Sequence, residues 1–465
     1  MVLDLKNIQY VYFIGIGGIG MSALARWFVA NGREVVGYDR SPSTLTATLE
    51  QENIVIHYTE NISNIPTHFI ANPSQVLVIY TPAVPKTHSE LVFFQENGFL
   101  IQKRAEVLGL LSKGLRCIAV AGTHGKTTTS SMIAHILTAS GVDCAAFLGG
   151  ITQNYQTNLL LNKTQTEDTF VVVEADEYDR SFLQLFPEIA VITSTDADHL
   201  DIYGSADEVQ SSYSKFASQV KKHLFISSNT YLLANASNTA TMHEYALQPF
   251  TSNKAIFASH IHISNARFVF NYVSPNTCIE KIEMLLPGFH NVENAIAAIS
   301  VALCIGIDSQ KIKESLASFR GVKRRFEYVF VSQNIIQIDD YAHHPTEIKA
   351  FLESVRALYP NKHITAIFQP HLFSRTKDFY EEFAKSLSLA DRLILLPIYP
   401  ARELQKDYEG ISSQIILDLV SSKDKQIVAY QDVTKFLQTQ KNEIVATIGA
   451  GDIEGLIAPI KKLWE

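Results

Sequence analysis

The chain has 465 residues, enough for about three domains, and its 46% apolar and 18% charged residues are those of a globular protein, which excludes a disordered chain. A formal net charge of −8 argues against sequence-independent nucleic-acid binding, which depends on a broad basic surface. No apolar run is long enough to cross a bilayer, no signal peptide is evident, and the four scattered cysteines favour a reducing cytoplasm over a disulfide framework or a structural zinc site.

Strand-like runs alternate with helical stretches along almost the whole chain, which predicts an α/β protein with mostly parallel sheets. Breaks in the pattern predict three domains, over residues 1–112, 113–320 and 321–465. Strands are expected at 10–14, 34–39 and 76–80 in the first domain, at 117–122, 170–176 and 190–198 in the second, and at 335–339, 364–368, 392–398, 427–430 and 443–448 in the third. Helices are expected over 292–306 and from Pro345 onward, since proline suits a first helical position.

A glycine-rich turn connects the first strand to a helix beginning near Met21. Its glycines are Gly15, Gly17, Gly18 and Gly20. Such a turn lets the backbone approach a pyrophosphate at a helix N-terminus, and Asp39 ends the next strand, about where dinucleotide folds place a ribose-binding carboxylate. The pattern fits a dinucleotide site or a tight turn without a ligand, and it does not say which nucleotide binds.

A second loop directly follows the strand at 117–122 and opens a helix. It consists of Gly122, Thr123, His124, Gly125, Lys126, Thr127 and Thr128. A lysine and a hydroxyl residue at a helix start are typical of phosphate loops, although Val120 stands where the strict pattern has glycine. The loop predicts that Lys126 holds the β- and γ-phosphates of a nucleotide and that Thr127 binds Mg²⁺.

Carboxylates follow the next two strands of the central domain. Glu174 to Asp179 read EADEYD, and Asp196 to Asp201 read DADHLD. Ligands of open α/β sheets bind at this edge and Mg²⁺ prefers oxygen donors, so the first group is a candidate metal site, with a solvated acidic loop as the alternative. His199, in the second group, could be a metal ligand, a base or an ordinary loop residue.

Three more polar segments stand at helix starts or at the second domain boundary. Asn291 and Asn294 share a helix face, which suits an adenine edge as well as simple helix capping. Residues 323–325 gather three cations that could meet phosphates or solvent. Residues 339–347 contain adjacent histidines but no soft ligands nearby, so zinc is not expected there.

Taken together, segments along the whole chain resemble the Mur ligase family. They read IGIGGIGMSALA, GTHGKTTT, EADEYDRSFL, DADHLDIYG, GFHNVENAIAAI, KRRFE, DDYAHHPTEI, FQPH followed by SRT, IYPARE and GAGDI. The resemblance implies a Rossmann-like N-terminal domain that binds a uridine nucleotide, a central P-loop ATPase domain with a mostly parallel sheet, and a C-terminal Rossmann-like domain.

The resemblance also implies an activity. We expect a ligase that uses ATP as co-substrate and two Mg²⁺ ions to join L-alanine to the carboxylate of UDP-N-acetylmuramate through an acyl phosphate, in cytoplasmic peptidoglycan precursor synthesis. One alternative is a sister ligase of murein recycling, which adds a tripeptide to the same nucleotide. A second, an NAD-dependent oxidoreductase, leaves the phosphate loop unexplained. The sequence allows a homo-oligomer and does not determine the oligomeric state.

Matched motif by motif, the resemblance implies roles for individual residues. Lys126, His199 and Arg325 are expected to be catalytic. The expected ATP-binding residues are Gly122, Thr123, His124, Gly125, Lys126, Thr127, Thr128, Asn291, Asn294 and Asp340. Gly15, Gly17, Gly18, Gly20 and Asp39 are expected to bind the uridine nucleotide, and Thr127, Glu174 and His199 to hold metal. His344 and Arg375 are expected in the region of the incoming amino acid.

The chain departs from the usual family pattern at a few positions. Leu372 stands where many members have arginine, and Tyr178 and Arg180 interrupt a segment that often reads EADESDASFL. Thr193 to Thr195 read TST where TNI is common. These differences leave the nucleotide motifs intact and bear mainly on the amino-acid region.

Overall fold

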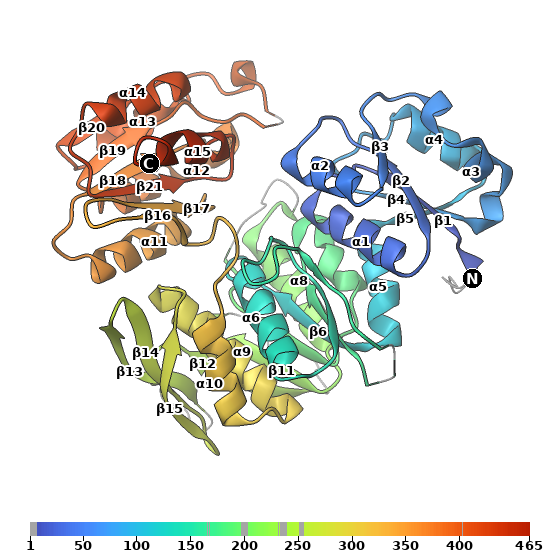
Figure 1. Ribbon diagram of the computed structural model, residues 1–465, viewed down its shortest axis with the longest axis horizontal. Coiled ribbons are helices and arrows are strands. Elements are labelled where there is room, and N and C mark those ends of the chain that lie inside the picture. The colour runs from blue at the N-terminus through green and yellow to red at the C-terminus, as the bar shows by residue number, and fades with distance from the viewer. Residues whose placement is uncertain are drawn as a thin grey trace. The chain divides into compact units, whose positions relative to one another are not determined.

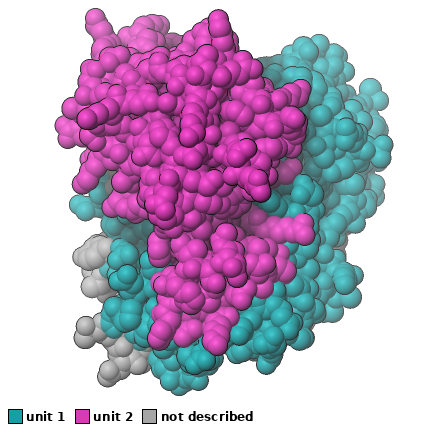
Figure 2. All heavy atoms as spheres, turned by 60° about the vertical axis from the view of Figure 1, so that its left-hand side comes forward, with its two compact units in different colours: residues 1–259, 272–280, 294–316 teal, residues 260–271, 281–293, 317–465 magenta. Residues whose placement is uncertain are grey.

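The computed structural model describes residues 7–164, 166, 168–196, 203–230, 232, 240–250, 255–401 and 403–465. They form an α/β structure with three sheets of mostly parallel strands, as the sequence predicts (Figure 1). By contacts the chain divides into two compact units (Figure 2): residues 1–259, 272–280 and 294–316, and residues 260–271, 281–293 and 317–465. No helix within the described ranges is long and apolar enough to cross a membrane. All four cysteines are free thiols.

The first sheet has five parallel strands in the order β3-β2-β1-β4-β5, which confirms the predicted Rossmann-like N-terminal domain. The strands are β1 (Tyr10–Ile14), β2 (Glu34–Tyr38), β3 (Val55–His57), β4 (Val76–Tyr80) and β5 (Leu100–Lys103). The helices are α1 (Ile19–Ala30), α2 (Thr44–Gln51), η2 (Ile62–Asn64), α3 (Thr67–Ala71), η3 (Pro73–Gln75), α4 (Ser89–Glu96) and α5 (Arg104–Gly114).

Helices cover both faces of this sheet, which is why β1 is an almost unbroken apolar run. Phe13 belongs to the apolar cluster that contains α1 and α5, whereas Tyr12 belongs to the cluster that contains α3 and α4. Side chains of successive strand residues point to opposite faces, so alternate residues of β1 serve alternate cores. The strand's carboxyl end is thereby fixed at the glycine-rich turn.

The second sheet has ten strands in the order β15-β14-β13-β12-β11-β10-β6-β9-β7-β8. The strands are β6 (Arg116–Ala121), β7 (Cys144–Phe147), β8 (Leu159–Leu160), β9 (Phe170–Glu174), β10 (Ile189–Ile192), β11 (His223–Ser227), β12 (Thr241–Ala246), β13 (Ile256–Ser264), β14 (Arg267–Val273) and β15 (Cys278–Met284). The helices are α6 (Lys126–Ala139), η4 (Tyr178–Gln184), α8 (Ala206–Ser218), α9 (Phe289–Ile305) and α10 (Ser309–Ser318). β6 lies between β9 and β10 and is parallel to both.

The first and second sheets share one apolar core. A single cluster of buried side chains contains Phe13 of β1, Leu24 of α1 and Val173 of β9. The side chain of Asn158, beside β8, donates to the carbonyl oxygen of Ile19 at 2.6 Å. Helix α1, which follows the glycine-rich turn, is therefore held by both sheets.

The third sheet has the order β16-β17-β21-β18-β19-β20 and is parallel except for the β16–β17 pair. The strands are β16 (Glu327–Val331), β17 (Ile336–Asp340), β18 (Ile364–Phe368), β19 (Arg392–Leu395), β20 (Asp424–Ile427) and β21 (Ile444–Ile448). The helices are α11 (Pro345–Leu358), α12 (Phe373–Leu387), η5 (Gln405–Asp407), α13 (Ser413–Leu419), η6 (Tyr430–Asp432), α14 (Val433–Gln438) and α15 (Glu454–Lys461).

The predicted strand bounds differ from the structure at several places, and two of the larger differences have a clear physical reason. The strand expected at 427–430 lies three residues earlier, at Asp424–Ile427, because its register with β19 pairs Asp424 with Arg392 along a partly exposed edge where polar residues are tolerated. The strand expected at 190–198 ends at Ile192. There the backbone leaves the sheet, and the next side chains bond to the phosphate loop.

Gly109 of α5 provides a stability test. A Cβ at this position would lie 2.5 Å from the carbonyl oxygen of Gln184, the last residue of η4. Alanine favours a helix over glycine by about 1 kcal/mol, but an overpacked contact with backbone costs about 1–3 kcal/mol. We expect Gly109→Ala to lower the thermal midpoint in calorimetry. In the comparison variant Gly455→Ala, on α15, the new methyl group meets the end of the Tyr430 side chain, which can shift if it gives up its hydrogen bond to the carbonyl oxygen of Asp452. Stabilisation by both variants would show that the Gly109 contact relaxes freely.

Candidate active site

The predicted phosphate loop runs from the end of β6 to the start of α6. Gly122 and Gly125 have φ angles of +136° and +81°, which residues with a Cβ rarely adopt. Gly125 also packs against the side chain of Asn294, where a Cβ would lie 2.6 Å from Oδ1. Thr127 and Thr128 are buried in the first turn of α6. The loop thus has the strand–loop–helix form that the sequence predicts, and Asn294 of α9 lies against it, a contact that the sequence does not show.

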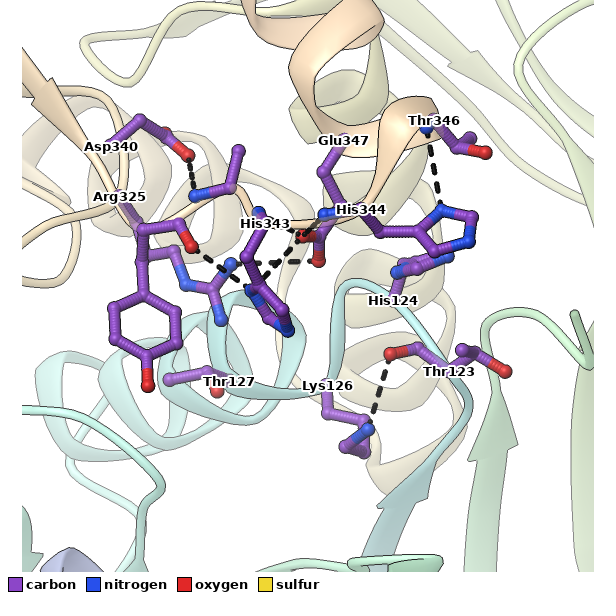
Figure 3. A network of polar contacts seen from close by, with 12 residues as sticks. Thr123, His124, Lys126, Thr127, Arg325, Asp340, His343, His344, Thr346 and Glu347 are labelled. Carbon is purple, nitrogen blue, oxygen red and sulfur yellow. Dashed lines mark hydrogen bonds and ion pairs between the residues drawn. The ribbon is translucent and has the colours of Figure 1, made fainter. Parts of the chain in front are cut away.

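Lys126 is enclosed at the centre of this loop. Its Nζ lies 2.7 Å from Oε2 of Glu177 and donates to the carbonyl oxygens of Gly122 at 2.6 Å and Thr123 at 3.2 Å (Figure 3 draws the Thr123 bond). The pKa of Lys126 is raised above its ordinary value. Burial by itself would lower this pKa, but the negative charges of Glu177 and neighbouring carboxylates outweigh the effect of burial. The ammonium is therefore charged and surrounded by oxygen atoms, as a phosphate-binding lysine must be.

Two of the predicted metal ligands lie together. The Thr127 hydroxyl donates to Oε1 of Glu174 at 3.0 Å, and the Gly149 amide donates to Oε2 at 2.9 Å. Both are hard oxygen donors at the carboxyl edge of the sheet, of the kind that Mg²⁺ prefers. Among residues that the structure describes, no group of three or more His, Cys, Asp or Glu side chains could hold a metal. His199, the third predicted ligand, lies outside the described residues.

Two hydroxyl residues after β10 support the phosphate loop, although in the sequence they stand out only as a departure from the family pattern. Thr193 donates to the carbonyl oxygen of His124, and Ser194 accepts from the His124 amide at 2.9 Å. The signal that could have found them is their position directly after a buried strand next to β6. Hydroxyl side chains there can satisfy loop groups that the sheet leaves unpaired.

The Asn291 and Asn294 pair lies in the first turns of α9, and both side chains are buried. Nδ2 of Asn291 donates to the carbonyl oxygen of Pro287 at 2.6 Å. This bond anchors Asn291 to the segment before α9, but it is not a capping bond, in which the side-chain oxygen accepts a backbone amide.

The glycine-rich turn of the first domain is closed by a carboxylate. Gly15 has a φ of +87°, and the Gly17 amide donates to Oδ2 of Asp39 at 2.7 Å. Gly18 precedes α1 as its N-terminal cap, and Gly20 lies in the first turn. Asp39 thus bonds to the turn itself, a contact that its position at a strand end did not reveal.

Arg104, the first residue of α5, is a functional candidate that the sequence motifs do not reveal. Its guanidinium occupies the space that a side chain at Gly20 would fill, and Nη2 lies 3.1 Å from Oδ2 of Asp176. The adjacent Lys103 pairs with Asp179 at 2.8 Å. A cation thus lies at the helix terminus where a pyrophosphate was predicted. The only signal was a pair of basic residues at the end of the last strand of that sheet.

In the second unit, Asp340 ends β17 and is buried. Its carboxylate accepts the Phe326 amide at 2.7 Å and the Ala342 amide at 2.8 Å. Burial raises the pKa of Asp340 to about 6, although Arg325 and the two amides oppose the shift. This carboxylate therefore changes charge close to neutral pH.

Arg325, predicted for phosphate contacts, and His344, predicted for the amino-acid region, lie near the start of α11 (Figure 3). His344 caps the helix, and its Nδ1 accepts the Thr346 amide at 3.4 Å. Arg325 places its guanidinium 5.2 Å from the ring centre of Tyr341 and 3.9 Å from Glu347. The structure thus brings Arg325 and His344 to one loop cluster.

Arg375 is buried in the first turn of α12, the helix that Leu372 caps. Leu372 has a φ of +72°, a backbone conformation that is costly for a branched side chain, and its amide donates to the Tyr399 carbonyl oxygen at 2.9 Å. The departure from the family pattern at this position therefore coincides with a strained residue.

Comparison with known proteins places the chain in a family. Three family models match it in order: the Mur ligase family catalytic domain over residues 10–116, the Mur ligase middle domain over 120–302, and the Mur ligase glutamate ligase domain over 324–451. A curated UDP-N-acetylmuramate–L-alanine ligase of Cytophaga hutchinsonii is 48% identical over 100% of this chain and 98% of its own. The chain belongs to the Mur ligase family. A protein of the same name from Flavobacterium psychrophilum is 48% identical over 99% of both chains.

Solved structures of Mur ligases share the fold. UDP-N-acetylmuramate–alanine ligase of Thermotoga maritima matches this Mur ligase with a TM-score of 0.82 and 29% identity, over 98% of this chain and 99% of its own. A murein peptide ligase of Psychrobacter arcticus matches with a TM-score of 0.69 and 22% identity over 98% of both chains, which is a likeness of fold.

The Lys126–Glu177 pair can be tested by stability alone. Removing one partner of a buried ion pair costs about 3–5 kcal/mol, so we expect Lys126→Ala to lower the thermal midpoint clearly at pH 8. Burial raises the pKa of Glu177, and a raised folded-state pKa means that protonation favours the folded state. The decrease in thermal midpoint caused by Lys126→Ala should therefore become smaller as the pH falls toward 5. A double variant that adds Glu177→Gln should show only a small decrease in thermal midpoint, without this pH dependence. If Lys126→Ala lowered the thermal midpoint equally at pH 8 and pH 5, the pairing would be contradicted.

Proposed function

We propose that this Mur ligase joins L-alanine to the carboxylate of UDP-N-acetylmuramate while ATP is converted to ADP and phosphate. The observation that carries the proposal is the enclosed, charged Lys126 in a phosphate loop, within a chain that aligns from end to end with two ligases of that name. The names of these relatives favour this activity over the tripeptide-adding alternative.

The proposed reaction brings two anions together. A muramyl carboxylate oxygen bonds to the γ-phosphorus of ATP as the bond to the β–γ bridging oxygen breaks, which gives an acyl phosphate and ADP. The amine of L-alanine then attacks the acyl carbon, loses a proton, and expels inorganic phosphate. Lys126 serves the first step, since a fixed cation stabilises the charge that builds up on the transferring phosphoryl group.

We assign the other nucleotide contacts residue by residue. The loop from Gly122 to Thr128 holds the phosphates, Asn291 and Asn294 the adenine, Asp340 the ribose, and Arg325 the charge of the phosphoryl group. Mg²⁺ fits the Thr127 and Glu174 oxygens, with His199 as a further proposed ligand, and when bound it neutralises phosphate charge. The number of ions is proposed to be two.

The remaining residues are proposed to bind the other two substrates, the muramyl nucleotide and L-alanine. The N-terminus of α1, which follows the glycine-rich turn, is proposed to face the diphosphate of the muramyl nucleotide, and Arg104 adds a cation there. Asp39, which holds the turn, is proposed to belong to this site. Arg375 suits the carboxylate of L-alanine, since a guanidinium forms two parallel bonds, and His344 is proposed to lie near the amine. The use of ATP and the four free thiols favour the cytoplasm.

The reaction predicts a strict requirement for every substrate. Purified protein should release ADP only when ATP, Mg²⁺, UDP-N-acetylmuramate and L-alanine are all present, measured with a coupled ADP assay. Lys126→Ala should lower kcat at least ~10²-fold, because a positioned electrostatic group is lost. Faster turnover with L-alanyl-γ-D-glutamyl tripeptide than with L-alanine would favour the recycling activity, and equal ADP release without the muramyl nucleotide would exclude both ligases.

The ribose assignment of Asp340 predicts a pH effect on ATP binding. With a pKa of about 6, the carboxylate is mostly ionised at pH 7.5 and mostly protonated at pH 5.5, so its capacity to accept ribose hydroxyls falls about fourfold over that range. We expect ATP affinity in calorimetry to fall with pH more steeply in the wild type than in Asp340→Asn. The ionisation of ATP itself affects both proteins alike. Parallel pH profiles would remove Asp340 from the site.

A further inference from the structure

Glu347 occupies the third position of α11 and closes its N-terminus. Its Oε2 accepts the backbone amides of His343 at 3.0 Å and His344 at 3.3 Å, while the His344 side chain caps the helix (Figure 3). The Glu347 side chain is only 14% exposed. These bonds fix the conformation of the turn that carries both histidines.

The same carboxylate also faces a cation and an imidazole. Its Oε1 lies 3.9 Å from Nη1 of Arg325, and its Oε2 lies 3.4 Å from Nδ1 of His343. Nδ1 of His343 also lies 3.0 Å from the carbonyl oxygen of Tyr341, which can only accept, so this nitrogen carries the proton. Tyr341 in turn presents its ring to Arg325. One carboxylate therefore joins the arginine to the histidine turn.

Helix capping alone does not require this negative charge. In α2 the equivalent position is held by Thr46, a neutral residue whose hydroxyl accepts the Ser43 amide at 2.8 Å. A glutamine fills the position as well as a glutamate does in capping boxes. The charge of Glu347 is therefore available for its second contact, the one with Arg325.

Several charged groups converge on this cluster from different elements. Arg325 precedes β16, Asp340 ends β17, Arg375 comes from α12 and His290 from α9, and each interacts electrostatically with Glu347, Arg325 or His343. Burial lowers the pKa of His290 and of His343 to about 4, so both rings are neutral near pH 7. At that pH the negative charges that face Arg325 come from Glu347 and Asp340.

We propose that Glu347 is a positioning residue that ties the Arg325 guanidinium to the His343–His344 turn. Its carboxylate keeps the cation proposed for the phosphoryl group and the histidine proposed for the amino-acid region in a fixed relation. This inference rests on the proposed function, and it adds a residue to which neither the sequence pattern nor the reaction had given a role.

Glu347→Gln separates the two contacts. The amide oxygen of glutamine still accepts the turn amides, but the ion pair with Arg325 is lost. We expect a thermal midpoint within about 2 °C of the wild type and a kcat at least about tenfold lower, with the KM for UDP-N-acetylmuramate almost unchanged and the KM for ATP and L-alanine raised. Glu347→Ala, which also loses the bonds to the turn amides, should have a lower thermal midpoint than Glu347→Gln.

Glu353→Gln is the matched control. Glu353 lies on the same helix and pairs with Lys349 at 3.8 Å, but half of its side chain is exposed. This variant should retain wild-type stability and kcat, because exposed pairs contribute little. A kcat for Glu347→Gln within about twofold of the wild type would overturn the proposal. The proposal would also be overturned if Glu347→Gln and Glu347→Ala lost stability to the same extent and lost kcat together with it.

A second measurement does not depend on turnover. Phenylglyoxal labels arginine side chains, and mass spectrometry with fragment-ion assignment can follow its reaction with Arg325. Release of the guanidinium from Glu347 should make Arg325 react at least severalfold faster in Glu347→Gln than in the wild type or Glu353→Gln. Unchanged labelling would contradict the tie to Arg325. A wild type that labels as expected but releases no ADP with L-alanine would instead refute the proposed function.

Discussion

A buried ammonium is the constraint on which the nucleotide machinery of this chain depends. Lys126 is largely enclosed, and a charge in such a place is tolerated only among opposite charges and hydrogen-bond acceptors. The carbonyl oxygens of Gly122 and Thr123 and the carboxylate of Glu177 supply both. Because Glu177 follows β9 and Lys126 follows β6, this one interaction fixes two loops against each other.

The parallel sheet explains why these loops meet. β6 lies between β9 and β10, so the carboxyl ends of all three strands reach the same edge. The phosphate loop follows the middle strand, the carboxylates follow one neighbour, and the hydroxyls of Thr193 and Ser194 follow the other. The carboxylate and hydroxyl partners of the loop therefore come from adjacent strands, although the segments are far apart in sequence.

Local patterns made the strand, loop and helix starts predictable. Gly125 needs a positive φ and Pro345 suits a first helical turn, and both requirements concern neighbouring residues only. Arg104 and Glu347 could not be found in that way, because the group that each contacts is selected by packing between distant segments. The predicted position of β20 was wrong for the same reason, because pairing with β19, and not the composition of β20 itself, decides where this strand begins.

The shared core of the first two sheets limits how far the chain can be divided into parts. Phe13 and Leu24 belong to the same apolar cluster as Val173, and Asn158 holds the start of α1. Segment 10–116, which one family model matches as a domain, would expose part of that cluster if it were expressed alone. A chimaera that takes this segment from another Mur ligase would therefore need the matching β7–β8 hairpin as well, so that α1 remains covered.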